Sequence, residues 1–138
     1  MEDIIRKRLE IEINKAYYTS KRYHTVSTFA FLYHEKPLPV DILGSYVRIS
    51  DHILKVDEHH YFINFTFTEQ TGAFKAAQNL LLYLDKYFNN RTSCIALDTF
   101  DTTQSPRIVL NRLIQILQET KKHSYCRIED ENILNEMI

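Results

Sequence analysis

Alternation of apolar and polar side chains in one short segment is the strongest constraint on how this chain folds. Over residues 61–67, large apolar side chains occupy every second position, with Asn64 and Thr66 between them. That period of two predicts a half-buried antiparallel strand. A second β-rich segment, residues 52–56, precedes it, so the four residues 57–60 are expected to reverse the chain. The sequence therefore predicts a β-hairpin closed by a polar turn.

Helical periodicity is found on both sides of this hairpin. Apolar residues recur at intervals of three and four over residues 2–22, 70–88 and 106–122, which predicts three amphipathic helices. Ser105 and Pro106 supply an N-cap and a first-turn proline for the last of them. The apolar stripe of the middle helix is predicted at Phe74, Ala77, Leu81, Leu84 and Phe88. Each stripe needs an apolar surface on which to pack.

Shorter elements complete the predicted fold. Further strands are predicted over residues 25–33, 92–97 and 125–128. A helix of one or two turns is predicted over residues 41–47 with Asp41 as its N-cap, and an acidic helical extension over residues 129–138. Helices interleaved with a hairpin predict an α/β (α+β) sandwich, in which a mostly antiparallel central sheet is flanked by helices. A chain of 138 residues can bury one core, so residues 1–138 are predicted to be a single domain.

Composition limits the partners that such a domain can have. The net charge is −1 and the Lys and Arg residues are spread along the chain, which argues against a nucleic-acid partner. No apolar run is long enough to cross a membrane and the first residues lack an apolar signal core, so no membrane partner and a cytoplasmic location are expected. Cys94 and Cys126 lie in apolar segments and are expected to be buried, reduced thiols. Gly44 and Gly72 are the only glycines, so no phosphate-cradling loop and no cofactor are predicted.

A familiar arrangement of residues spans the hairpin. Arg48-Ile-Ser-Asp51 leads, after five residues, into Asp57-Glu58-His59-His60-Tyr61, which we call the signature turn. This arrangement resembles the central hairpin of GGDEF (diguanylate cyclase) domains, in which Arg-x-x-Asp precedes Gly-Gly-Asp-Glu-Phe at a tight turn. In this chain both glycines of that signature are replaced by acids and both acids by histidines. The hairpin is therefore similar to that of a degenerate GGDEF domain.

The resemblance extends over roughly residues 8–128. Residues 26–33 resemble the family's first strand, and Thr92-Ser-Cys-Ile-Ala96 resembles a later one. Residues 110–128 are similar to the family's late helix and the strand after it, with Lys121 at the position of a phosphate-contacting lysine. The resemblance implies a shortened GGDEF or nucleotidyl-cyclase-like fold over the whole chain and a place in bacterial cyclic di-GMP signalling.

Departures from the family pattern bear on catalysis. The aspartate with which the family's first strand holds its metal is replaced by Leu32 or Tyr33, depending on the register. The longer segment that binds guanine in the family is reduced to residues 36–41, and the arginine that accompanies Lys121 is replaced by Tyr125. Phosphoryl transfer requires a metal clamp and positive groups on the phosphates. The chain is therefore predicted to be a catalytically inactive relative of the diguanylate cyclases, not an enzyme.

The acidic and imidazole side chains of residues 57–60 permit two interpretations. Carboxylates and imidazoles suit zinc or nickel, so the turn could hold a metal. Adjacent residues in a tight turn do not easily converge on one ion, however, and no distant cluster of ligands completes the set. We therefore predict a solvated polar turn in which His59 and His60 are exposed and no metal is bound.

Arg48 and Asp51 also permit two interpretations. The resemblance implies a product-binding inhibitory site, in which the arginine forks onto a guanine edge or a phosphate and the aspartate accepts a hydrogen bond from the base. Alternatively, Asp51 caps the start of the next strand and pairs locally with Arg48. A helix arginine that often completes the inhibitory site is replaced by Asn79.

These observations leave two main hypotheses for function. The first is a non-catalytic GGDEF-like signalling or interaction module that works through a protein partner, self-association included. Nine Tyr and eight Phe in so short a chain favour this hypothesis, because aromatic residues are enriched at interfaces. The second is a sensor of cyclic di-GMP or another guanine nucleotide that binds through Arg48 and Asp51. An enzyme of unrelated chemistry is a third and weaker hypothesis.

Overall fold

In the described part of the chain, the fold is built from five strands and five helices. The computed structural model describes residues 2–98, 102–123 and 125–135. The elements follow one another as α1 (Asp3–Tyr23), β1 (Ser27–Tyr33), α2 (Val40–Gly44), β2 (His52–Asp57), β3 (His60–Thr66), α3 (Gln70–Phe88), β4 (Cys94–Asp98), α4 (Pro106–His123), β5 (Ile128–Glu129) and α5 (Asn132–Asn135). This is the order of elements that the sequence predicts.

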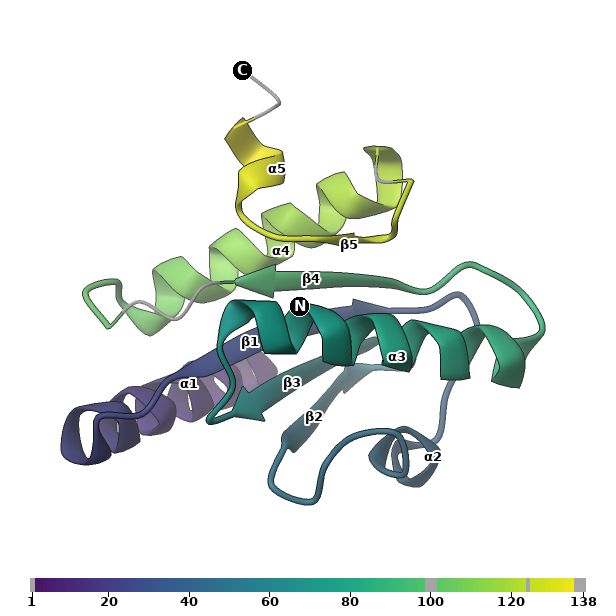
Figure 1. Cartoon of the computed structure of the whole chain (residues 1–138). Coiled ribbons are helices and arrows are strands. Elements are labelled where there is room, and N and C mark those ends of the chain that lie inside the picture. The colour runs from purple at the N-terminus through teal and green to yellow at the C-terminus, as the bar shows by residue number, and fades with distance from the viewer. Residues whose placement is uncertain (1, 99–101, 124, 136–138) are drawn as a thin grey trace.

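All five strands lie in one sheet, in the order β2-β3-β1-β4-β5 (Figure 1). β1 pairs antiparallel with β3 on one side and with β4 on the other, and β2 pairs antiparallel with β3. The β4–β5 pair is parallel. The prediction of a mostly antiparallel sheet flanked by helices is confirmed.

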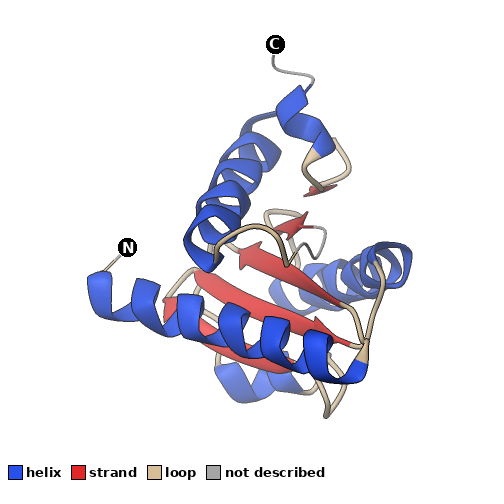
Figure 2. Ribbon diagram, turned by 90° about the vertical axis from the view of Figure 1, so that its left-hand side faces the viewer, coloured by secondary structure: helices blue, strands red, loops and turns tan. Residues whose placement is uncertain are grey.

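Helices cover both faces of the sheet (Figure 2). Phe29 and Phe31 of β1 pack with residues of α1 and α4 on one face. Ala30 and Leu32 pack with residues of α2 and α3 on the other. Because each face of β1 meets an apolar layer, the strand is a nearly continuous apolar run instead of an alternating one.

Local signals account for several helix ends. α1 and α3 both end at a residue in the left-handed region, His24 and Asn89, each with φ 54°. Asparagine tolerates this conformation better than most residues. At the start of α4, the backbone N–H of Ile108 donates to Oγ of Ser105 over 3.3 Å, so the predicted N-cap is confirmed.

The hairpin differs from its prediction in two respects. β3 is buried on both faces, because α1 and α4 cover the side that was expected to face water. The prediction of a half-buried strand is therefore wrong, and Phe67 lies beyond its end with φ 53°. Asp57 and His60 still pair across the hairpin, so the reversal itself consists of Glu58 and His59.

Other corrections concern short elements and one thiol. α2 begins at Val40, so Asp41 lies in its first turn and does not cap it; the N-cap is Pro39, whose side chain offers no hydrogen bond. The last strand is shorter and later than predicted, and the described part of the C-terminal extension holds only the single turn of α5, with residues 136–138 outside the described chain. Cys94 is buried as expected, but Cys126 is exposed. Across the described segments, no helix combines the length and apolarity needed to cross a membrane.

The buried stripe of α3 generates a stability prediction. Leu81 is buried against the sheet, whereas its neighbour Leu82 is 61% exposed. Leu81→Ala should lower the free energy of unfolding by about 2 to 5 kcal/mol, through lost transfer free energy and the cavity left behind. Leu82→Ala, the matched control on the same helix, should change it by less than about 0.5 kcal/mol. Urea unfolding of both variants checks this, and equal midpoints would contradict the orientation of α3.

Candidate functional site

The side chains of the signature turn are bonded to one another. The carboxylate of Asp57 accepts a hydrogen bond from the backbone N–H of His59 over 2.8 Å, and Nδ1 of His60 lies 2.8 Å from the same oxygen. Glu58 pairs with Lys55 at the surface. Burial acts to raise the pKa of Asp57, but the hydrogen bonds from His59 and His60 outweigh it and lower that pKa below its ordinary value.

His60 is linked to a residue far away in the sequence. Its Nε2 lies 3.2 Å from Nζ of Lys121 on α4. Because Nδ1 faces a carboxylate, we assign the ring hydrogen to Nδ1, which leaves the lone pair of Nε2 directed at the lysine. The Lys121 amine also lies 3.7 Å from the centre of the Tyr33 ring. Partial burial lowers the pKa of Lys121, and the negative charge of Asp57, which acts to raise that pKa, only partly offsets the effect. We call these three residues the Asp57–His60–Lys121 cluster.

This cluster opens onto a small cavity between α1, α4 and the sheet. The volume of the cavity is about 270 Å³. It is lined by Arg6, Phe31, Val56, Asp57, His60, Ile114, Leu117, Gln118 and Lys121. Arg6 is held at its place by a hydrogen bond from Nη1 to Oδ1 of Asn111, 2.7 Å long. The cavity therefore combines an apolar wall with an amine, an imidazole and a guanidinium.

The end of β1 carries no carboxylate. Leu32 is fully buried in the α3 layer, and Tyr33 faces the opposite layer beneath Lys121. His34 follows, completely buried, with its ring stacked between the rings of Tyr61 and Phe88. Whichever register is applied to the family's metal aspartate, the position holds an apolar or aromatic side chain.

His34 is a buried ionisable group that the candidate residues drawn from the sequence did not include. Its Nδ1 donates to the carbonyl of Lys36, and its buried Nε2 has no partner among the described residues. The backbone of His34 pairs with His59, whose Nδ1 lies 3.2 Å from the His34 carbonyl oxygen. Burial lowers the pKa of His34 from 6.5, because a proton on Nε2 would place a charge in an apolar layer. A histidine directly after an apolar strand is the signal that could have identified it.

The predicted exposure of His59 and His60 is wrong. Both rings are half-buried, because His59 turns toward the end of β1 and His60 toward α4. Within the described chain, no group of three His, Cys, Asp or Glu side chains is arranged to hold a metal ion.

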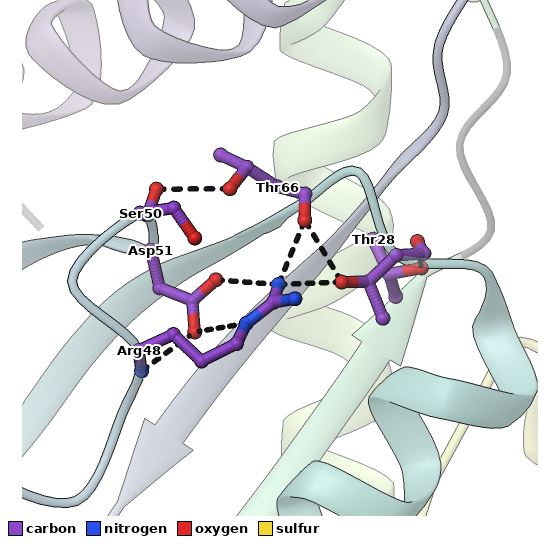
Figure 3. Close-up of polar contacts among 6 residues, drawn as sticks. Thr28, Arg48, Ser50, Asp51 and Thr66 are labelled. Atoms are coloured by element: carbon purple, nitrogen blue, oxygen red, sulfur yellow. Dashed lines mark hydrogen bonds and ion pairs between the residues drawn. The ribbon is translucent and has the colours of Figure 1, made fainter.

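Arg48 and Asp51 form a closed local clasp (Figure 3). Nη2 of Arg48 donates to Oδ1 of Asp51 over 2.8 Å, and its Nε lies 3.3 Å from Oδ2. Nη2 also reaches the carbonyl of Thr66 and Oγ1 of Thr68, at 2.7 and 2.6 Å. The backbone N–H of Arg48 donates to Oδ2 of Asp51 as well. The clasp therefore fixes the loop before β2 to the end of β3.

One side of this clasp faces a surface cavity of about 550 Å³. Asn79 of α3 lines that cavity together with Arg48 and Asp51, so the fold places the two predicted residues beside the position that carries asparagine in place of the helix arginine. The stacked rings of Tyr46 and Tyr83, 5.0 Å between centroids, form another part of the wall. Nη1 of Arg48 has no hydrogen bond within the described chain, and this side chain is 55% exposed.

The sheet order, the placement of the hairpin and the two helical layers together define a GGDEF-like fold. The GGDEF domain of DgcB from Caulobacter crescentus, solved in complex with c-di-GMP, superposes with a TM-score of 0.73 over 92% of this chain and 90% of that chain, at 11% sequence identity. A structure of the coiled coil and GGDEF domain of DgcB, also with c-di-GMP, gives a TM-score of 0.69 over 90% of this chain and 79% of that one, at 10% identity. No family model and no curated protein matches the sequence. The predicted GGDEF-like fold is confirmed.

Burial of neutral His34 generates a prediction about pH. Unfolding returns the ring to water and to a pKa near 6.5, above its folded value, so the unfolded chain binds the proton more readily. The stability from neutral His34 is complete above pH 6.5 and is lost as the pH falls toward the lower, folded pKa. His34→Gln should flatten the decline in unfolding free energy below pH 6.5. His24→Asn, at an exposed site whose left-handed backbone asparagine also tolerates, should leave the decline intact, and equal slopes in the wild type and His34→Gln would contradict the assignment.

The Arg48–Asp51 clasp generates a second prediction. The Asp51 side chain is only 2% exposed, and its removal leaves the Arg48 amide and guanidinium without their acceptors. Asp51→Ala should lower the free energy of unfolding by about 1 to 3 kcal/mol. Glu58→Ala, which removes the exposed pair with Lys55, should cost less than about 1 kcal/mol. If urea unfolding gives the same midpoint for both variants, the clasp does not stabilise the fold.

Proposed function

We propose that the chain is a non-catalytic GGDEF-like signalling module that acts in the cytoplasm through contact with another protein. The observation that carries the non-catalytic part is the identity of the residues where this fold would hold a metal. Leu32 is in the core, Tyr33 lies beneath Lys121, and His60 is bonded to Asp57. Neither Leu32 nor Tyr33 offers a carboxylate, so the end of β1 cannot contribute to a metal clamp beside the hairpin.

The outward face of α1 supports the second part, contact with a protein. Ile4, Ile11 and Tyr18 recur at seven-residue intervals and are 74%, 53% and 71% exposed. Seven residues are close to two helical turns, so these side chains form one stripe. The stripe lies opposite the residues with which α1 packs on the sheet, Leu9, Ile13, Ala16 and Tyr17. In Figure 2, α1 runs across the front of the sheet with this side uncovered.

The charges beside the stripe specify what can cover it. Exposed cations flank it along the helix: Lys7, Arg8, Lys15, Lys21 and Arg22. Over residues 2–22 six cations outnumber four acids, so a second copy of the chain would bring a surface of the same net charge against this one, which disfavours association. We therefore assign the surface to an acidic, amphipathic segment of a different protein, whose apolar residues meet the stripe and whose carboxylates meet the cations.

A photo-reactive residue at position 11 tests this contact. Cross-linking at Ile11 in cells should capture one acidic partner, whereas the same residue at Leu82, which is 61% exposed on α3, should not. The captured protein, once purified, should bind the wild type and lose that binding to Lys7→Glu/Arg8→Glu, because the charge reversal repels its carboxylates. Equal capture from the two positions, or binding that survives the reversal, would argue against the contact; a chain that purifies as a dimer through α1 would point to self-association instead.

A nucleotide sensor is the alternative function, favoured by one specific observation. Arg48, Asp51 and Asn79 line one cavity, next to the stacked Tyr46 and Tyr83, and both DgcB structures hold c-di-GMP. Against this ligand, most donors of the Arg48 guanidinium are already engaged by Asp51, Thr66 and Thr68. A ligand could use Nη1 without opening the clasp, or Nη2 only by displacing those partners.

Solution assays distinguish the two functions. Purified protein incubated with GTP and Mg²⁺ or Mn²⁺ should form no cyclic di-GMP, because the residues at the end of β1 cannot clamp a metal. Calorimetric titration with cyclic di-GMP should give no heat of binding under the primary proposal. The sensor function would be established by micromolar binding of cyclic di-GMP that is lost in Arg48→Ala. The control variant Arg91→Ala, at an exposed arginine, should then still bind. Turnover of GTP would overturn both.

A further inference from the structure

The Asp57–His60–Lys121 cluster has the geometry of an activated amine. A lysine becomes a nucleophile only when it loses its proton, which requires a nearby base and an environment that disfavours the ammonium. Nε2 of His60 lies 3.2 Å from Nζ of Lys121, within the reach expected of a general base. The Asp57 carboxylate, 2.8 Å from Nδ1, fixes the tautomer with the lone pair toward the lysine and stabilises the imidazolium that would form.

The cavity beside the amine limits what can reach it. At about 270 Å³ it is smaller than the pockets that take drug-sized ligands, and since a water molecule occupies about 30 Å³ it admits a ligand of roughly ten heavy atoms. Phe31, Val56 and Leu117 form an apolar wall on which a short acyl chain can rest. Arg6, held by Asn111, adds a positive charge that a dianionic leaving group would approach.

We infer that Lys121 is a site of covalent acylation by a small acyl phosphate, with His60 as the base and Asp57 as the residue that positions it. Nζ of Lys121 attacks the carbonyl carbon and a C–N bond forms. The bond between that carbon and the phosphate oxygen breaks, and the electron pair leaves with inorganic phosphate. The proton lost by the neutral amine passes to Nε2 of His60 and from there to the departing phosphate, so the products are an amide and hydrogen phosphate.

Acylation would change the surface around the signature turn. The modified nitrogen carries no charge, so its cation–π contact with the Tyr33 ring is lost. The amide nitrogen keeps one hydrogen, which it can donate either to Nε2 of His60 or to solvent. This inference does not rest on the proposed protein contact, because α1 enters it only through Arg6.

The chain contains its own control for the experiment. Lys122 is exposed on the next position of α4, so both lysines can be followed in the same molecule by peptide mass spectrometry. On incubation of the full chain with acetyl phosphate, Lys121 should be acetylated on the order of a hundredfold faster than Lys122, at the low end of what a positioned base supplies. Equal rates in the wild type would overturn the inference, and this comparison requires no variant to fold.

Variants then separate the base from its positioning residue. His60→Ala should bring the rate at Lys121 down to that at Lys122. Asp57→Asn should keep part of the preference and shift its dependence on pH, because the imidazolium loses its partner while the ring remains. A preference for Lys121 that survives His60→Ala, or a pH profile unchanged by Asp57→Asn, would assign the reactivity to exposure alone and overturn the role of the cluster.

Discussion

The pairing of β1 with a neighbour on each side is the constraint on which the rest of the structure depends. β3 and β4 take its backbone hydrogen bonds on both edges, and helical layers cover both of its faces. A strand enclosed in this way tolerates polar side chains only where a partner is supplied, as for Thr28, whose hydroxyl donates to the carbonyl of Thr68 over 2.9 Å. The strand therefore ends in Leu32, Tyr33 and His34, whose side chains all make packing or stacking contacts.

Sequence patterns predicted the elements well where one physical signal dominates. α3 has a single clear stripe and distinct ends, and its predicted bounds agree with the structure. β3 shows where alternation of apolar and polar residues misleads. Asn64 and Thr66 indicate a solvent-exposed face, yet Asn64 is 4% exposed because α1 packs over it. Whether a polar residue in a strand meets water depends on a helix that lies far away in the sequence, and alternation alone carries no information about that helix.

The residues of the candidate site were likewise predictable from the sequence only in part. The Arg48–Asp51 pair is local, three residues apart, so the resemblance of this short motif to the GGDEF family was enough to propose it. The contact between His60 and Lys121 joins residues 61 positions apart, and only the fold makes them neighbours. The two histidines of the turn were expected in water because the turn is short. Both rings are instead half-buried, His59 against the end of β1 and His60 against α4. An imidazole can bury its apolar carbon atoms when its nitrogens have hydrogen-bond partners.

The position of β1 between β3 and β4 also sets an order for assembly during synthesis. Residues 34–59 separate β1 from β3, a shorter stretch than the one that separates β1 from β4, so the edge of β1 that faces β3 can be paired first. Its other edge stays open until α3 and then β4 have left the ribosome, and β5 can dock only after α4. During that interval an apolar strand presents unpaired N–H and C=O groups, the arrangement that promotes association between chains. The nascent chain is thus most exposed to aggregation between the completion of the hairpin and the arrival of Cys94–Asp98, a period that chaperone binding or a slower elongation rate would affect most.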